Sequence, residues 1–165
     1  MTTTATTTHL KSNLAVLIDA ENISAAHIPA IIAKIAEDYG NATVRRVYGD
    51  WTTPQLTPWK KALESQALRP SQQFRHIKGK NSSDGALIMD AMELLHAREV
   101  DGFCIVSSDS DFTGLATRIR EKGLRVYGFG MKQTMRAFVA ACDEFVFLDA
   151  EHLIDVRLED IVSIG

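Results

Sequence analysis

The chain has 165 residues, of which 45% are hydrophobic and 24% charged, and its formal net charge is −3. This composition is typical of a soluble globular protein and excludes intrinsic disorder for most of the chain. Its length suits one domain of about 100–200 residues. No apolar run approaches the ~20 residues that a membrane helix needs, and two cysteines do not make a disulfide framework.

The Thr-rich start of the chain has no hydrophobic segment of an export signal and no Arg-rich amphipathic pattern. We predict a disordered tail over residues 1–12 and a single domain over residues 13–165. A cytoplasmic location is the corresponding expectation.

Apolar, strand-like runs alternate with helical patterns along the rest of the chain. The expected strands are 14–18, 43–48, 73–77, 102–106, 124–128 and 145–148. The expected helices are 28–39, 57–67, 84–95, 112–122 and 133–142, and the last residues leave room for one more. This alternation predicts an α/β protein with a largely parallel sheet and helices on both of its faces.

Acidic residues follow the first and fourth of these strands, at the edge where a parallel sheet binds ligands. Asp19 ends the first strand, and Asp109 and Asp111 follow the fourth. Asp84 begins a helix on the same stripe as its apolar residues. Clustered carboxylates repel unless a cation neutralises them, and oxygen ligands without His or Cys favour Mg²⁺ or Mn²⁺ over Zn²⁺. These four Asp residues are therefore the predicted metal ligands, and Asn22 is predicted to orient a water or a carboxylate.

Each of these residues also has a simpler interpretation. Asp19 and Asn22 are types that cap helices or stabilise turns. Asp111 is suited to capping the helix that follows it, and Asp84 to complementing a helix dipole. Asp90 lies about 120° from Asp84 around the helix and is expected on the surface. The joint placement of three elements at one sheet edge favours a functional site.

Four segments contain these residues: LAVLIDAENI, YGDW, KNSSDGALIMDAM and SSDSDF. They resemble the NYN domain of the PIN-like ribonuclease superfamily, most of all its LabA-like bacterial branch, over about residues 14–148. The resemblance implies a three-layer α/β/α sandwich with a PIN-like sheet of about six strands. It also implies a Mg²⁺- or Mn²⁺-dependent site that cleaves RNA.

The resemblance assigns the predicted ligands to family motifs. Asp19 and Asn22 match the first acidic motif, Asp84 matches the helix-borne acid, and Asp109 with Asp111 matches the S-x-D-x-D-F signature. These five residues are the catalytic residues that the resemblance implies.

Two segments are strongly basic, since residues 60–80 and 118–136 each carry six Lys or Arg against one Glu. Lys78 and Lys80 precede Asp84 and are predicted to hold a phosphate beside the metal. The basic residues at 118–122 are expected to be solvated. Trp51 and Trp59 have two interpretations, stacking on a base or packing in the protein.

The leading hypothesis is a metal-dependent endoribonuclease that hydrolyses RNA phosphodiester bonds, with RNA as its partner and no membrane association. Two alternatives stay open: a non-catalytic module that binds RNA or a nucleotide or scaffolds partners, and a small-molecule phosphohydrolase that uses the same metal site. A homodimer would deepen a shallow cleft, but no residue indicates one. The negative net charge does not oppose RNA, because basic segments alternate with acidic ones along the chain.

Overall fold

The structure, a computed structural model, describes residues 11–73, 85–148 and 153–157. The strands are β1 (Asn13–Asp19), β2 (Asn41–Gly49), β3 (Arg69–Gln72), β4 (Gly102–Val106), β5 (Arg125–Met131), β6 (Glu144–Leu148) and β7 (Leu153–Arg157). The helices are α2 (Ile28–Lys34), α3 (Trp59–Ser65), α4 (Gly85–Ala97), α5 (Thr113–Glu121) and α6 (Arg136–Ala141). Shorter segments are η1 (Ala25–His27), η2 (Ile35–Tyr39), η3 (Pro54–Leu56) and η4 (Ser110–Phe112). Most of the predicted tail lies outside the described residues.

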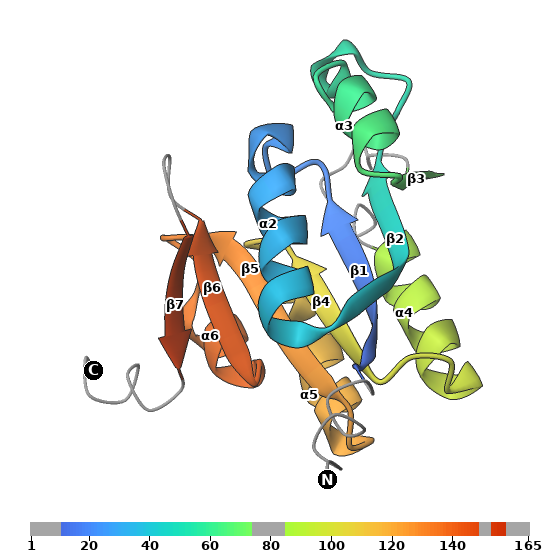
Figure 1. Cartoon of the computed structure of the whole chain (residues 1–165). Coiled ribbons are helices and arrows are strands. Elements are labelled where there is room, and N and C mark those ends of the chain that lie inside the picture. Colours follow the sequence, from blue (N-terminus) through green and yellow to red (C-terminus); the bar gives the residue numbers. More distant parts are fainter. Residues whose placement is uncertain (1–10, 74–84, 149–152, 158–165) are drawn as a thin grey trace, which may run out of the picture.

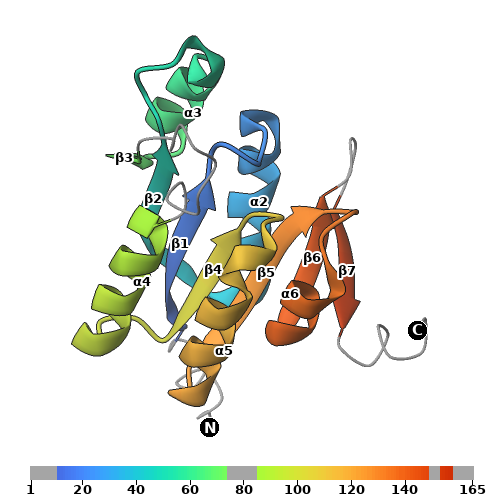
Figure 2. The ribbon, with the colours of Figure 1, turned by 180° about the vertical axis from the view of Figure 1, so that it is seen from behind.

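One sheet forms the middle layer, with the strand order β3-β2-β1-β4-β5-β6-β7. The first six strands in the sequence run parallel, and β7 pairs antiparallel with β6. Helices α2 and α3 cover one face of the sheet, and α4, α5 and α6 cover the other (Figure 1 and Figure 2). The predicted α/β/α sandwich with a mainly parallel, PIN-like sheet is therefore confirmed.

One expected strand differs in position from the structure, and the expected final helix falls partly outside the described residues. The expected strand at 73–77 is instead β3, which ends at Gln72; residues 74–77 lie outside the described part of the chain. β3 is an edge strand that accommodates Pro70 and exposes most of its side chains, so no apolar alternation marks it. β7 follows β6 and pairs antiparallel with its outer edge; residues 158–165, where a final helix was expected, lie outside the described residues.

The burial pattern of the central strand β1 determines the direction of the Asp19 side chain at its end. Every residue of β1 after Asn13 is buried, because helices cover both faces of the sheet. Along β1, Leu14, Val16 and Ile18 pack in the core on the α2 side, and the residues between them pack in the core on the α4 side. Since side chains alternate along a strand, Asp19 points to the same face of the sheet as α4, α5 and α6.

Strands β1 and β4 are parallel neighbours, with Ile18 opposite Val106. Their continuations therefore meet at the edge where the parallel strands end, called here the carboxyl edge. The opposite edge is called the amino edge. Among the described residues, no helix is long and apolar enough to cross a lipid bilayer.

Candidate active site

Asp19 is a buried carboxylate at the carboxyl edge, and only 3% of its surface is exposed. The side-chain amide of Asn22 donates to Asp19 Oδ2 at 2.5 Å, and the hydroxyl of Ser107 donates to the same oxygen at 2.8 Å. The backbone N–H of Glu21 donates to Asp19 Oδ1 at 3.2 Å. All three donors are neutral. The prediction that Asn22 orients a carboxylate agrees with this contact.

Ser107 joins Asp19 to the loop that follows β4. Its hydroxyl donates to Asp19 and accepts the backbone N–H of Asp109 at 3.0 Å. Ser107 was not among the predicted site residues, although the period of two along β4 would have indicated it. Ile105 faces the α4 side of the sheet, so Ser107, two residues later, faces the same side as Asp19.

Asp109 caps the short helix η4, since its Oδ1 accepts the backbone N–H of Asp111 at 2.9 Å. Within the described residues no hydrogen bond uses Asp109 Oδ2. The alternative prediction, that Asp111 caps the following helix, is wrong because Phe112 is the N-cap residue of α5 and no side chain caps that helix. Asp111 lies inside η4 and its side chain is exposed to solvent.

The electrostatics of Asp19 follow from its burial. Burial raises the pKa of the Asp19 carboxyl above its usual value, hydrogen bonds from Asn22, Ser107 and Glu21 act to lower it, and the nearby negative charge of Asp109 raises it further. Among the described residues, no positive charge therefore offsets the burial of this carboxylate. A cation between Asp19 and Asp109 would relieve both the desolvation and the repulsion.

The structure does not test the whole predicted ligand set, because Asp84, Lys78 and Lys80 lie outside the described residues. Within the described residues, no group of three or more His, Cys, Asp or Glu side chains could hold a metal ion. Asp19 and Asp109 are brought together, and the place of Asp84 beside them stays a prediction.

Glu21 and Asp50 extend the polar edge toward β2, and neither was predicted to have this role. The carboxylate of Glu21 accepts the backbone N–H of Asp50 at 2.9 Å. Asp50 Oδ1 accepts the hydroxyl of Thr52 at 2.5 Å and the amide of Gln72 at 2.9 Å. These contacts hold the loops after β1 and β2 together, so they place the YGDW segment next to Asp19.

Asp90 does not lie freely on the surface, and that expectation is wrong. Its Oδ2 accepts the buried hydroxyl of Tyr48 at 2.7 Å and pairs with the Arg46 guanidinium at 3.2 Å. Its side chain is 31% exposed. The side chain of Asp90 on α4 meets two side chains of β2, a packing that helical spacing alone does not reveal.

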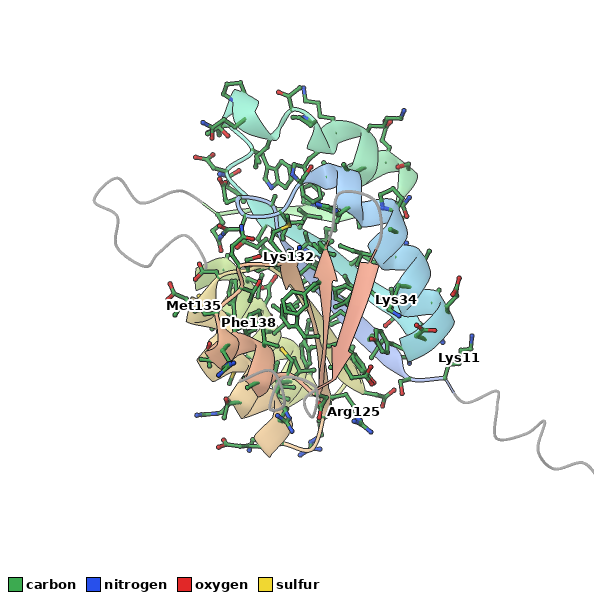
Figure 3. The ribbon with its side chains drawn as sticks, turned by 90° about the vertical axis from the view of Figure 1, so that its left-hand side faces the viewer. Lys11, Lys34, Arg125, Lys132, Met135 and Phe138 are labelled. Atoms are coloured by element: carbon green, nitrogen blue, oxygen red, sulfur yellow. The ribbon has the colours of Figure 1, made fainter. Side chains whose placement is uncertain are left out.

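The basic segment 118–136 divides between the two edges of the sheet. Figure 3 shows Arg125 and Lys132 at opposite ends of β5. At the amino edge, Arg120 and Arg125 pair with Asp143 at 3.3 Å and 3.8 Å. Lys132 follows the carboxyl end of β5 and is exposed, so it lies at the same edge of the sheet as Asp109.

The two tryptophans have different environments. Trp59 is 2% exposed and belongs to the core on the α2 side, so base stacking by Trp59 is excluded. Trp51 is half-buried, and its indole N–H donates to the carbonyl of Ser71 at 2.9 Å.

The sheet order and the acidic residues at its carboxyl edge define the class of this protein, an α/β/α protein with a PIN-like fold. The sequence profile of the NYN domain matches residues 13–149. The chain belongs to the NYN domain family. Nothing among these findings assigns the LabA-like branch, which stays a prediction.

The fold also matches a crystal structure of a protein of unknown function from Vibrio parahaemolyticus. The sequences are 20% identical, the TM-score is 0.67, and the match covers 87% of this chain and 96% of the other. At that identity the likeness concerns the fold. A search of curated proteins found no significant match.

Proposed function

We propose that this protein is a metal-dependent nuclease that hydrolyses phosphodiester bonds of RNA. The single observation that supports the proposal most is the environment of Asp19. This carboxylate is 3% exposed, its hydrogen-bond donors are neutral, and the charge of Asp109 lies nearby. Membership of the NYN family, whose fold is that of PIN-like nucleases, gives this environment a chemical interpretation.

The residues at the carboxyl edge fit a hard divalent cation. Their donor atoms are carboxylate oxygens, which Mg²⁺ and Mn²⁺ prefer, and Asp109 has one carboxylate oxygen that accepts no hydrogen bond from the described residues. Asp19 and Asp109 would hold the cation, with Asp84 as a third ligand and Asp111 acting through water. When bound, the cation would lower the pKa of a water molecule and polarise a phosphoryl oxygen.

The other residues of the chain would position these groups. Asn22 and Ser107 hold Asp19 Oδ2 through hydrogen bonds, so the carboxylate has one orientation. Ser107 also fixes the backbone of Asp109. Lys78 and Lys80 are the proposed phosphate contacts on one side, and exposed Lys132 lies at the same edge on the other side.

The decisive experiment compares two aspartates that flank β4. The full chain is incubated with single-stranded and structured RNA in the presence of Mn²⁺ or Mg²⁺. We expect Asp109→Asn to reduce cleavage about 100-fold or more, because such a cation supplies several kcal/mol of charge stabilisation. Asp101→Asn is the matched control, since Asp101 also accepts a backbone N–H, from Asn13 at 2.8 Å, but at the amino edge.

Three results would contradict this proposal in different ways. Equal cleavage by wild type and Asp109→Asn would mean that the reaction does not use these acids. RNA binding without cleavage, together with no Mn²⁺ binding by calorimetry, would identify a binding module. Hydrolysis of small phosphate esters alone would identify a phosphohydrolase.

A further inference from the structure

A pocket of about 420 Å³ lies beside the carboxyl end of β2. The loop after β2, η3 and α3 form it, and Figure 1 shows α3 beyond the arrowhead of β2. Its lining includes Trp51, Thr53, Leu56, Thr57, Lys60 and Pro70. The volume falls in the range of roughly 300–1,000 Å³ that is usual for small-molecule sites.

The first residue of the pocket lining, Trp51, follows β2, the strand that pairs with β1. Asp19 is opposite Tyr48 in the pairing of β1 with β2, and neighbouring strands are about 4.8 Å apart. Two residues beyond Asp19, the carboxylate of Glu21 accepts the backbone N–H of Asp50. Trp51 follows directly. A chain of short contacts therefore joins the candidate metal site to the wall of this pocket.

Trp51 is held in a fixed position in that wall. Its indole N–H donates to the Ser71 carbonyl at 2.9 Å, and its backbone N–H donates to the side chain of Gln72 at 3.2 Å. The ring packs against the core on the α2 side and is half-buried. An aromatic ring that is already fixed loses little conformational entropy when it stacks on a ligand.

The remainder of the lining combines apolar and polar groups. Leu56 and Pro70 are apolar, whereas the Thr53 and Thr57 hydroxyls and the Lys60 ammonium are polar. Lys60 is exposed, and within the described residues no carboxylate pairs with it. A nucleobase has the complementary chemistry, because its faces are apolar and its edges are polar, and in a strand it is followed by a phosphate.

We propose that this pocket binds one base of a single-stranded RNA whose scissile phosphate lies at Asp19 and Asp109. Trp51 stacks on the base, and Lys60 contacts a neighbouring phosphate. The inference rests on the proposed nuclease function for the identity of the strand. It goes further in assigning a substrate subsite to the pocket beside α3.

The test measures RNA binding without cleavage, so that it is separate from the test of the nuclease. Binding of a fluorescently labelled single-stranded RNA of mixed sequence is followed by anisotropy in EDTA. We expect Trp51→Leu to weaken binding about tenfold, within the range found for the loss of one base–aromatic stack. Trp51→Phe keeps an aromatic face, and we expect a smaller loss.

Lys60→Gln and its neighbour Lys61→Gln form a matched pair. Both lysines are exposed on α3, but Lys61 lines a different pocket, with Ser24 and Pro58. We expect Lys60→Gln to weaken RNA binding several-fold and to lower its salt dependence. Lys61→Gln is expected to change binding by less than twofold.

A series of RNAs, each with one abasic nucleotide at a different position, supplies the control for misfolding. At the position that occupies the pocket, the abasic RNA is expected to bind wild type and Trp51→Leu equally. A tenfold difference that persists at every abasic position would overturn the subsite. So would unchanged binding by both Trp51 variants, or a mononucleotide that binds wild type as tightly as the strand does. Loss of binding in Trp51→Leu without cleavage by wild type in Mn²⁺ would keep the subsite and refute the nuclease.

Discussion

Asp19 and Asp90 are two carboxylates on the same side of the sheet, and their partners differ in charge. Asp90 pairs with the guanidinium of Arg46 and accepts the hydroxyl of Tyr48. Asp19 is more deeply buried, yet its hydrogen-bond donors are the neutral Asn22, Ser107 and Glu21 backbone. Asp90 therefore has a countercharge from Arg46, whereas no cationic side chain of the described residues hydrogen-bonds to Asp19.

This difference separates a structural carboxylate from a candidate ligand. The pair of Asp90 with Arg46 joins α4 to β2 and needs nothing from solution. Burying a carboxylate without a cation is costly, and the charge of Asp109 adds to that cost at Asp19. An acid held in this state is suited to bind a cation from solution.

The largest expected effect comes from Asp19→Asn. At a Mn²⁺ concentration about 100 times the dissociation constant, bound metal would stabilise the wild type by about 2.7 kcal/mol. We expect Asp19→Asn to lose this stabilisation. We also expect its rate of RNA cleavage to fall by at least about 100-fold. Without metal, its unfolding temperature should equal or exceed that of wild type, because the uncompensated charge is gone. Thermal unfolding with and without Mn²⁺ measures this, and a Mn²⁺-induced rise in Asp19→Asn would contradict the comparison.

A smaller effect is expected at Asp90. Asp90→Ala leaves Arg46 and the buried hydroxyl of Tyr48 without their shared partner, which costs about 2 kcal/mol. For a chain of this size that lowers the unfolding temperature by roughly 6 °C, and Mn²⁺ should not restore the difference. Asp38→Ala is the control, because the Asp38 side chain is 45% exposed and its i,i+4 ion pair with Lys34 is worth about 0.5 kcal/mol or less. An equal fall in unfolding temperature in both variants would show that the contacts of Asp90 with Arg46 and Tyr48 stabilise the fold no more than an ordinary surface ion pair does.

The smallest expected effect is a change in pH dependence. Because burial raises the pKa of Asp19 in the folded protein, the folded state binds more protons than the unfolded state between the two pKa values. The stability that Asp19 contributes is present below its unfolded pKa and is lost as the pH rises through its folded pKa. Metal-free unfolding from pH 4 to pH 7 should therefore show this loss in wild type, relative to Asp19→Asn. Parallel pH profiles for the two proteins would refute the raised pKa.

Much of the candidate site was predictable from the sequence because it depends on local patterns. The aliphatic run before Asp19 and the run before Ser107 predict two buried parallel strands, and parallel strands end at the same edge. This was enough to predict that Asp19 and Asp109 come together. The alternation of side chains along β4 would also have indicated Ser107, had it been followed one residue beyond the strand.

The contacts that escaped prediction join residues far apart in the sequence. Asp90 meets Arg46 across 44 positions, and helical spacing gave no sign of that partner. Trp51 and Trp59 are the same residue type only eight positions apart in the sequence, yet Trp59 is in the core and Trp51 lines a pocket. The edge strand β3 was misplaced because its exposed residues carry no apolar period.

The sequence by itself determined the layered α/β architecture and the edge at which the acidic residues gather. Those features follow from the periods of two and 3.6 residues that backbone geometry imposes. Only the tertiary structure decided that Asp90 meets a guanidinium, whereas Asp19 meets neutral donors among the described residues. That outcome depends on which elements pack against each other, and so on whether a guanidinium or an amide reaches each carboxylate oxygen.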